Sequence, residues 1–172
     1  MGDGRQTVTM FRRRGRSCVA TFTPQEAQVL RQCVAELAAL VSDASDPDDP
    51  AVGRLFPDAY PSDPEAAAEF RRLTQEELRT AKLEQAKTVL EKLLESGGEV
   101  RLAEEEADLW LRALTDVRLA LGTRLGIDDD TDIEAELDEA VGRDPRSPRV
   151  GQLSVYAYLS FLQESLVGAL MD

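Results

Sequence analysis

The sequence has no histidine, only two cysteines and few aromatic residues. Without imidazole, the chain lacks the commonest general base, proton shuttle and zinc ligand, which excludes most hydrolase and zinc-site designs. Cys18 and Cys33 are too few for a structural zinc or iron–sulfur site. We therefore expect no cofactor, no metal, no catalytic residue and a non-enzymatic function.

Signals for secretion or membrane insertion are also lacking. The N-terminal arginines precede mixed polar residues, whereas a secretion signal would continue with an apolar core. The most apolar stretch, residues 153–171, contains Gln163 and Glu164, and a bilayer would penalise the glutamate. We expect a cytoplasmic protein without membrane contact, in which residues 150–170 form a buried amphipathic helix.

The charge is unevenly distributed along the chain. The formal net charge is -13, yet residues 1–18 hold five arginines against one aspartate, so 15 basic and 32 acidic residues follow them. Such an acidic body repels phosphate backbones and attracts basic protein surfaces. We therefore expect a protein partner and no direct contact with nucleic acid. Solubility alone would also be a sufficient reason for the acidity.

Composition and periodicity predict a mainly α fold: a helical bundle-like single domain of residues 1–172 with a small N-terminal β-hairpin. Two short apolar runs flank an arginine-rich turn, which predicts a hairpin over residues 7–22 with Gly15 in the turn. Thr23 and Glu26 have the spacing of a capping box, so a helix should begin between them.

Further helices are expected from about residues 62, 103, 132 and 150. Residues 43–61 are predicted to form an irregular loop, because they are acidic and rich in proline. A second capping-box pattern at Thr74 predicts a break or a new start within the helix that begins near residue 62. The acidic turn at residues 128–132 resembles a calcium loop, but Ile133 occupies the glycine position, so it indicates a helix N-terminus.

The two cysteines have two open interpretations. Cys18 shares a strand face with Ala20 and Phe22, and Cys33 lies in the apolar stripe of the first helix, so both thiols should face the core. They either approach each other and form a redox switch or are two inert apolar residues.

Two segments are candidate docking surfaces. Phe56 and Tyr60 each precede a proline, which favours an extended backbone and aligns them with Leu55 along one surface. This strip either pins the long loop onto the helices or forms an exposed docking ridge. The hairpin arginines either contact an acidic partner or form a solvated turn. The candidate docking residues are Leu55, Phe56, Tyr60, Arg12, Arg13 and Arg14.

Three segments carry a resemblance to a known family: RLFPDAYPSDPEAAAEFRRLT (54–74), LRALTDVRLALGTRLG (111–126) and YLSFLQESLVGAL (158–170). Together they resemble an actinobacterial family labelled a domain of unknown function, which includes an oxidation-sensing regulator. The resemblance implies a regulatory role in oxidative stress and a stress-response sigma factor or the transcription machinery as partner. That regulator's sensing cysteines are closely spaced, unlike Cys18 and Cys33, so their role does not transfer by motif.

These observations lead to ranked expectations for function. The first is a non-enzymatic regulatory or adaptor protein that acts through protein–protein contacts. The alternative is a thiol-based redox sensor that uses Cys18 and Cys33. A carboxylate-dependent enzyme comes third. A homo-oligomer is compatible with all of these.

Overall fold

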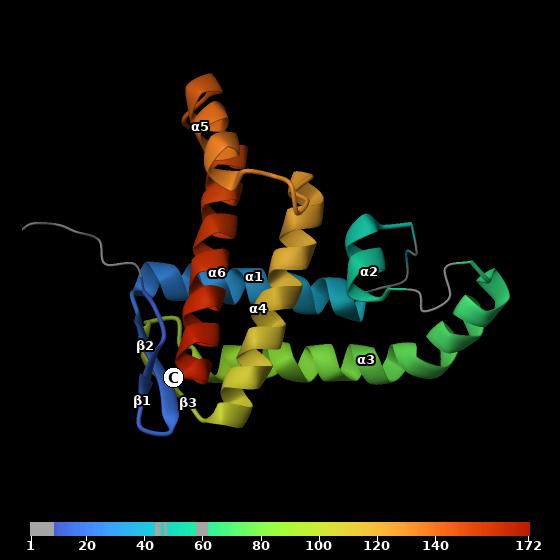
Figure 1. Cartoon of the computed structure of the whole chain (residues 1–172), viewed down its shortest axis with the longest axis horizontal. Coiled ribbons are helices and arrows are strands. Elements are labelled where there is room, and N and C mark those ends of the chain that lie inside the picture. Colours follow the sequence, from blue (N-terminus) through green and yellow to red (C-terminus); the bar gives the residue numbers. More distant parts are fainter. Residues whose placement is uncertain (1–8, 44–45, 47, 58–61) are drawn as a thin grey trace, which may run out of the picture.

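The computed structural model describes residues 9–43, 46, 48–57 and 62–172. The described residues form six helices and a three-stranded antiparallel sheet, so the expected mainly α fold is confirmed (Figure 1). In chain order the elements are β1 (Arg12–Arg14), β2 (Ser17–Phe22), α1 (Pro24–Ser42), α2 (Pro50–Leu55), α3 (Pro64–Lys92), β3 (Gly98–Leu102), α4 (Glu104–Leu125), α5 (Ile133–Arg143) and α6 (Pro148–Met171).

The predicted hairpin forms the first two strands of the sheet. Gly15 occupies the turn with φ 62°, a left-handed conformation that favours glycine. The first strand begins only at Arg12, because Phe11 already turns into the core and its N–H donates to Ser165 of α6 at 2.9 Å. β2 also pairs with β3 along its other edge, so the hairpin becomes part of a three-stranded sheet.

The start of α1 is the one the sequence predicts. Thr23 is the N-cap, and its hydroxyl accepts a hydrogen bond from the Glu26 N–H at 3.1 Å. The Glu26 carboxylate accepts one from the Thr23 N–H at 2.8 Å. The reciprocal pair satisfies two backbone donors that a helix N-terminus otherwise leaves free.

The prediction of an irregular loop over residues 43–61 is wrong for residues 50–55, which form α2. Asp49 caps this helix by accepting a hydrogen bond from the Ala51 N–H at 2.9 Å, and Pro50 occupies its first position. Proline is favoured there because its fixed φ suits a helix and its missing N–H would have had no helical partner.

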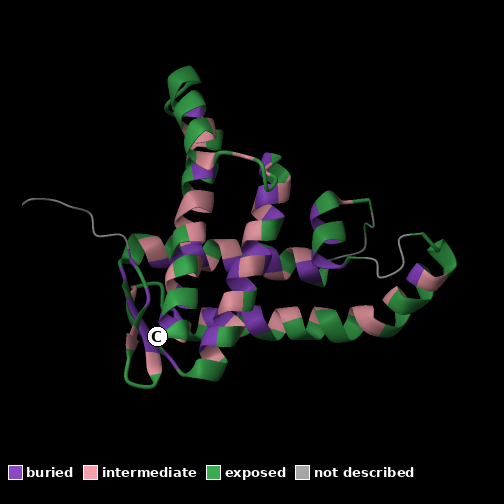
Figure 2. Cartoon of the chain, in the orientation of Figure 1, coloured by how far each residue is buried: buried purple, intermediate pink, exposed green. Residues whose placement is uncertain are grey.

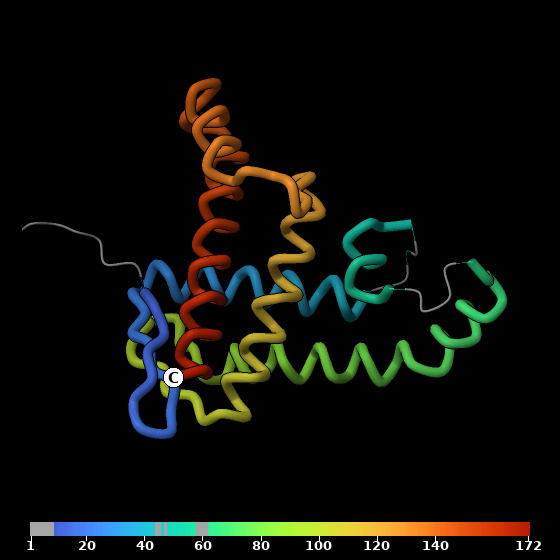
Figure 3. The backbone as a smooth tube through the Cα atoms, in the orientation of Figure 1, coloured from blue at the N-terminus to red at the C-terminus, as the bar shows by residue number. Residues whose placement is uncertain are grey.

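Thr74 does not break α3, which is continuous over 29 residues. Its hydroxyl donates to the carbonyl oxygen of Phe70 at 2.7 Å, one turn earlier. Such a bond is compatible with a helix and often bends it. The N-terminal turns of α3 indeed curve away from the axis of the rest of the helix (Figure 3).

The core is centred on α4, whose Trp110 is fully buried. Its ring lies 5.8 Å from that of Phe11 and 6.2 Å from that of Phe22, so the aromatic residues join the sheet to the helices. Buried residues concentrate where α1, α4 and α6 meet the sheet, while the outer part of α3 is mostly exposed (Figure 2). A smaller cluster of Leu125, Ala140 and Leu153 holds α5 against α6.

Candidate functional site

The structure places the two cysteines on different parts of the core. Cys18 lies on β2, is buried and pairs with Leu102 of β3. Cys33 is half-buried on α1 and lines a hollow of about 80 Å³ together with Ala120 and Arg124 of α4. Both are free thiols.

The distance along α4 between the neighbour of Cys18 and the neighbour of Cys33 shows how far apart the two thiols lie. α4 begins at Glu104, two residues after the partner of Cys18, and Ala120 follows 16 residues later. A rise of about 1.5 Å per residue separates the two positions by about 24 Å. A disulfide needs Cα atoms within about 7 Å. The fold therefore does not bring Cys18 and Cys33 together.

Their environments also disfavour the reactive thiolate. Burial, reinforced by the nearby Glu36 carboxylate, raises the pKa of Cys33 to about 11. Burial likewise raises the pKa of Cys18, although Arg13 opposes the shift. Because the thiolate is the nucleophile, both residues are poorly activated in this fold.

Two of the three residues in the predicted docking strip are buried. Leu55 is 2% and Phe56 is 8% exposed, and both belong to the main hydrophobic cluster. They therefore pin the segment onto the helices, the first of the two alternatives, and do not form an exposed ridge. Tyr60 lies outside the described residues.

The hairpin arginines lie at the edge of the sheet. Arg12 and Arg14 are exposed, and Arg13 donates from Nε to the Gly15 carbonyl oxygen at 2.9 Å. β1 is an edge strand, since it pairs only with β2 in the sheet. The hairpin is thus a basic projection on an acidic protein, and its role in docking stays a prediction.

The outward face of α6 is nearly free of charge. Phe161, Val167 and Met171 are 38%, 38% and 82% exposed, and Glu164 is the only charged residue between Val150 and Met171. The sequence indicates that this helix is buried, which is correct only for its inward face, with Leu159, Leu162 and Leu166. Exposed apolar patches of this kind often mark interaction sites.

A second surface feature is a hollow of about 240 Å³ bordered by α2, α4, α6 and the turn after α4. Its lining includes Arg54, Arg118 and the aromatic residue Tyr156. Arg118 stacks over that ring, with the guanidinium carbon 5.3 Å from the ring centroid. The sequence did not predict this site, because each arginine alone resembles an ordinary surface residue.

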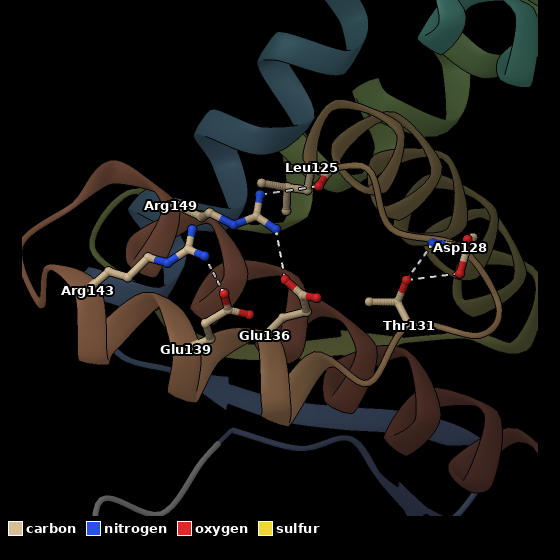
Figure 4. Close-up of polar contacts among 7 residues, drawn as sticks. All are labelled: Leu125, Asp128, Thr131, Glu136, Glu139, Arg143 and Arg149. Carbon is tan, nitrogen blue, oxygen red and sulfur yellow. Dashed lines mark hydrogen bonds and ion pairs between the residues drawn. The ribbon is translucent and has the colours of Figure 1, made fainter.

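The turn after α4 is held by its own hydrogen bonds. The Asp128 carboxylate accepts from the Thr131 hydroxyl at 2.9 Å (Figure 4). It also accepts from the Asp130 N–H at 3.0 Å. Asp132 caps α5, as the sequence predicts, by accepting from the Ala135 N–H at 3.1 Å. On the adjacent side, Arg149 of α6 bridges the Leu125 carbonyl and the Glu136 carboxylate, which anchors α5 (Figure 4).

In the part of the chain that the structure describes, no three or more His, Cys, Asp or Glu side chains converge in a way that could hold a metal ion. No helix formed by those residues is long and apolar enough to cross a bilayer.

The fold and these surfaces define a mainly helical protein with a small sheet at one end, a basic hairpin and a helix face that is nearly free of charge. The chain belongs to the family described as Domain of unknown function (DUF2017), which matches residues 8–170. The resemblance found in the three sequence segments is therefore confirmed.

Mycobacterial relatives carry a functional name. The chain is 29% identical to a Mycobacterium tuberculosis protein named oxidative stress regulator AosR, over 88% of this chain and 81% of that protein. It is 37% identical to a Mycobacterium leprae protein that also bears the AosR name, over 74% of this chain. The match spans only 61% of the M. leprae protein. No solved structure matches the chain.

Proposed function

We propose that this protein is a non-enzymatic regulator that acts through contact with another protein, and that the outward face of α6 is the contact surface. The observation that carries the proposal is the composition of this face. On a chain of net charge -13, it exposes Phe161, Val167 and Met171 with one carboxylate. A depletion of charge with large apolar side chains is typical of the centre of a protein–protein interface.

The acidic surroundings define the kind of partner that fits. Helices α4 and α5 and the turn between them carry an excess of exposed glutamates and aspartates, so a partner with an apolar patch bordered by basic residues would be complementary. The relatives named oxidative stress regulator support a regulatory role in oxidative stress. We therefore propose a stress-response sigma factor, or another protein of the transcription machinery, as the partner.

A disulfide between Cys18 and Cys33 is not our proposal for the regulatory signal, because the fold separates the two thiols and raises the pKa of both. The association with the partner should accordingly be unchanged when Cys33 is replaced by serine and peroxide is added. A peroxide-dependent association that the Cys33→Ser variant loses would restore the thiol sensor as the better function.

The docking surface can be tested by calorimetric titration of the protein with the stress-response sigma factor encoded in the same genome. The variant Phe161→Glu/Val167→Glu should weaken binding by about 30-fold or more, the effect of removing an interface hot spot. Leu73→Glu is the matched control, since Leu73 is 64% exposed on α3, away from the α6 face. Circular dichroism of all variants checks the fold.

Two outcomes would contradict the proposal. If the α6 variant binds as well as the unchanged protein, the contact surface lies elsewhere. If neither the sigma factor nor RNA polymerase binds, the proposed partner is wrong. Affinity should also fall as salt increases, because the acidic surroundings attract the partner.

A further inference from the structure

The hollow between α2, α4 and α6 is lined by two arginines, Arg54 and Arg118, and neither forms an ion pair with a carboxylate in the described part of the chain. Arg118 donates to three neutral oxygens: Nε to Ser160 at 3.0 Å, Nη1 to Gln163 at 2.6 Å and Nη2 to Tyr156 at 3.5 Å. Arg54 has neither a hydrogen bond nor an ion pair in the described part of the chain. A guanidinium has five N–H donors, so Arg118 keeps two for a ligand.

Other partly buried cations of this protein have partners that offset their charge. Lys82 pairs with Asp116 at 2.8 Å, and Arg79 pairs with Glu76 at 3.0 Å. Arg31 donates to the carbonyl oxygens of Leu90 and Leu93 at the negative end of α3. Arg118 differs because its partners are uncharged, although it is half-buried among α4 and α6.

Neighbouring groups hold Arg118 in place. The Gln163 amide donates to the Thr115 hydroxyl at 2.8 Å, which directs its oxygen toward the guanidinium. The Ser160 hydroxyl is fixed by the Tyr156 carbonyl at 3.0 Å. Gly122 admits the Tyr156 ring, since a Cβ there would lie 3.2 Å from it. A fixed guanidinium loses little entropy when it binds an anion.

Negative charge borders the same hollow. Asp128 uses one carboxylate oxygen within its own turn, and the other has no partner among the described residues (Figure 4). Asp129 also lines the hollow, and neither a hydrogen bond nor an ion pair engages its side chain in the part of the chain that the structure describes. These carboxylates would repel a phosphate or a dicarboxylate, but they could accept hydrogen bonds from an ammonium group.

We propose that this hollow binds a small zwitterion of the amino-acid class. Its carboxylate would pair with Arg54 and Arg118, and its ammonium group with Asp128 and Asp129. The apolar part of the molecule would lie against Leu119 and Ile127, which also line the hollow. The site is independent of the protein contact proposed for the outward face of α6.

Calorimetric titration of the full chain with L-alanine, L-leucine and L-glutamate tests this proposal. Butyrate and butylamine, each with one of the two charged groups, are the controls. At least one amino acid should bind, and both controls should bind more weakly. Arg54→Gln and Asp129→Asn should each weaken binding about tenfold or more, the effect of losing a charge-assisted hydrogen bond. Arg16→Gln, on the hairpin, should leave it unchanged.

Three results would overturn the proposal. The first is no binding of any of these amino acids at millimolar concentration. The second is binding that survives both Arg54→Gln and Asp129→Asn. The third is butyrate binding as tightly as the best amino acid, since the ammonium group would then contribute nothing. Arg54 and Asp129 are exposed, so both variants should fold, which circular dichroism can verify.

Discussion

The ion pair between Lys82 of α3 and Asp116 of α4 should respond strongly when one partner is removed. Its nitrogen–oxygen distance is 2.8 Å, and the side chains are only 12% and 9% exposed. Asp116→Ala would leave the ammonium group of Lys82 in the interface without a counter-ion. Breaking a buried pair in this way costs about 3–5 kcal/mol, against a total stability of about 5–15 kcal/mol for a typical domain.

Removal of both charges should have a much smaller effect. In Lys82→Met/Asp116→Leu no charge remains to be desolvated, and such replacements are often neutral or stabilising by about 1–4 kcal/mol. The double variant should therefore be more stable than Asp116→Ala, although it differs more from the natural sequence.

Urea unfolding at equilibrium measures these differences. With a slope of about 2 kcal/mol per molar urea, Asp116→Ala should lower the midpoint by about 1.5–2.5 M. The slope itself should not change, because the same surface is exposed on unfolding. Lys82→Ala serves as the reciprocal single variant and completes the double-mutant cycle.

The pH dependence provides a second test of the same pair. Burial raises the pKa of Asp116 above its ordinary value of 3.8, although Lys82 opposes the shift. The unfolded chain therefore loses this proton more readily. Relative to Asp116→Asn, the stability of the protein should be highest below pH 3.8 and should fall as pH rises through the raised pKa.

If Asp116→Ala costs less than about 1 kcal/mol, the pair behaves like an exposed one and the reasoning is refuted.

Three further predictions concern local features. Gly126→Ala should cost about 1–2 kcal/mol in thermal unfolding, because φ is 72° but the Cβ has free space. Gly97→Ala should cost clearly more, because φ is 74° and the Cβ would lie 2.5 Å from a carbonyl oxygen of β2; equal losses would contradict this. Burial raises the pKa of Glu26, but hydrogen bonds from two threonines outweigh it and lower the pKa below 4.5. Relative to Glu26→Gln, the protein should therefore have extra stability above pH 4.5 and lose it as pH falls through the lowered pKa. Urea midpoints of both proteins, measured at several pH values, would contradict this if the difference between them did not change with pH. Alkylation of Cys33, followed by peptide mapping, should be about 100-fold slower at pH 8 in the folded than in the unfolded chain, since its pKa rises from 9.0 to about 11; similar rates would exclude the shift.

Local signals predicted the helix starts well. Thr23 and Glu26 act as the sequence indicates, because a capping box depends on residues three positions apart, and α5 begins at the end of the acidic turn as expected. The Asp49–Pro50 start of α2 carried the same kind of signal, but the surrounding acidic residues and prolines made a loop the simpler interpretation. At Thr74, a capping-box pattern lies inside a helix, so sequence alone cannot distinguish the two uses.

Contacts between distant segments could not be predicted in the same way. β3 pairs with β2 although Phe22 and Gly98 lie 76 positions apart in the sequence, and no local pattern of Gly98–Leu102 identifies that partner. The Arg54–Arg118 hollow likewise depends on how α2 packs against α4. The two cysteines each face the core as expected, but the core is large enough to keep them apart.

The basic hairpin has a consequence for how the protein moves in an electric field. The exposed arginines at positions 12, 14 and 16 lie at one end of the molecule, while the acidic helix α5 lies at the far end of α6 from the hairpin (Figure 1). Separated charges of opposite sign give the molecule a large dipole moment. An approaching charged body therefore rotates the protein before the two touch, and the hairpin end turns toward negative potential. The orientation of an encounter is thus selected while the surfaces are still separated by water.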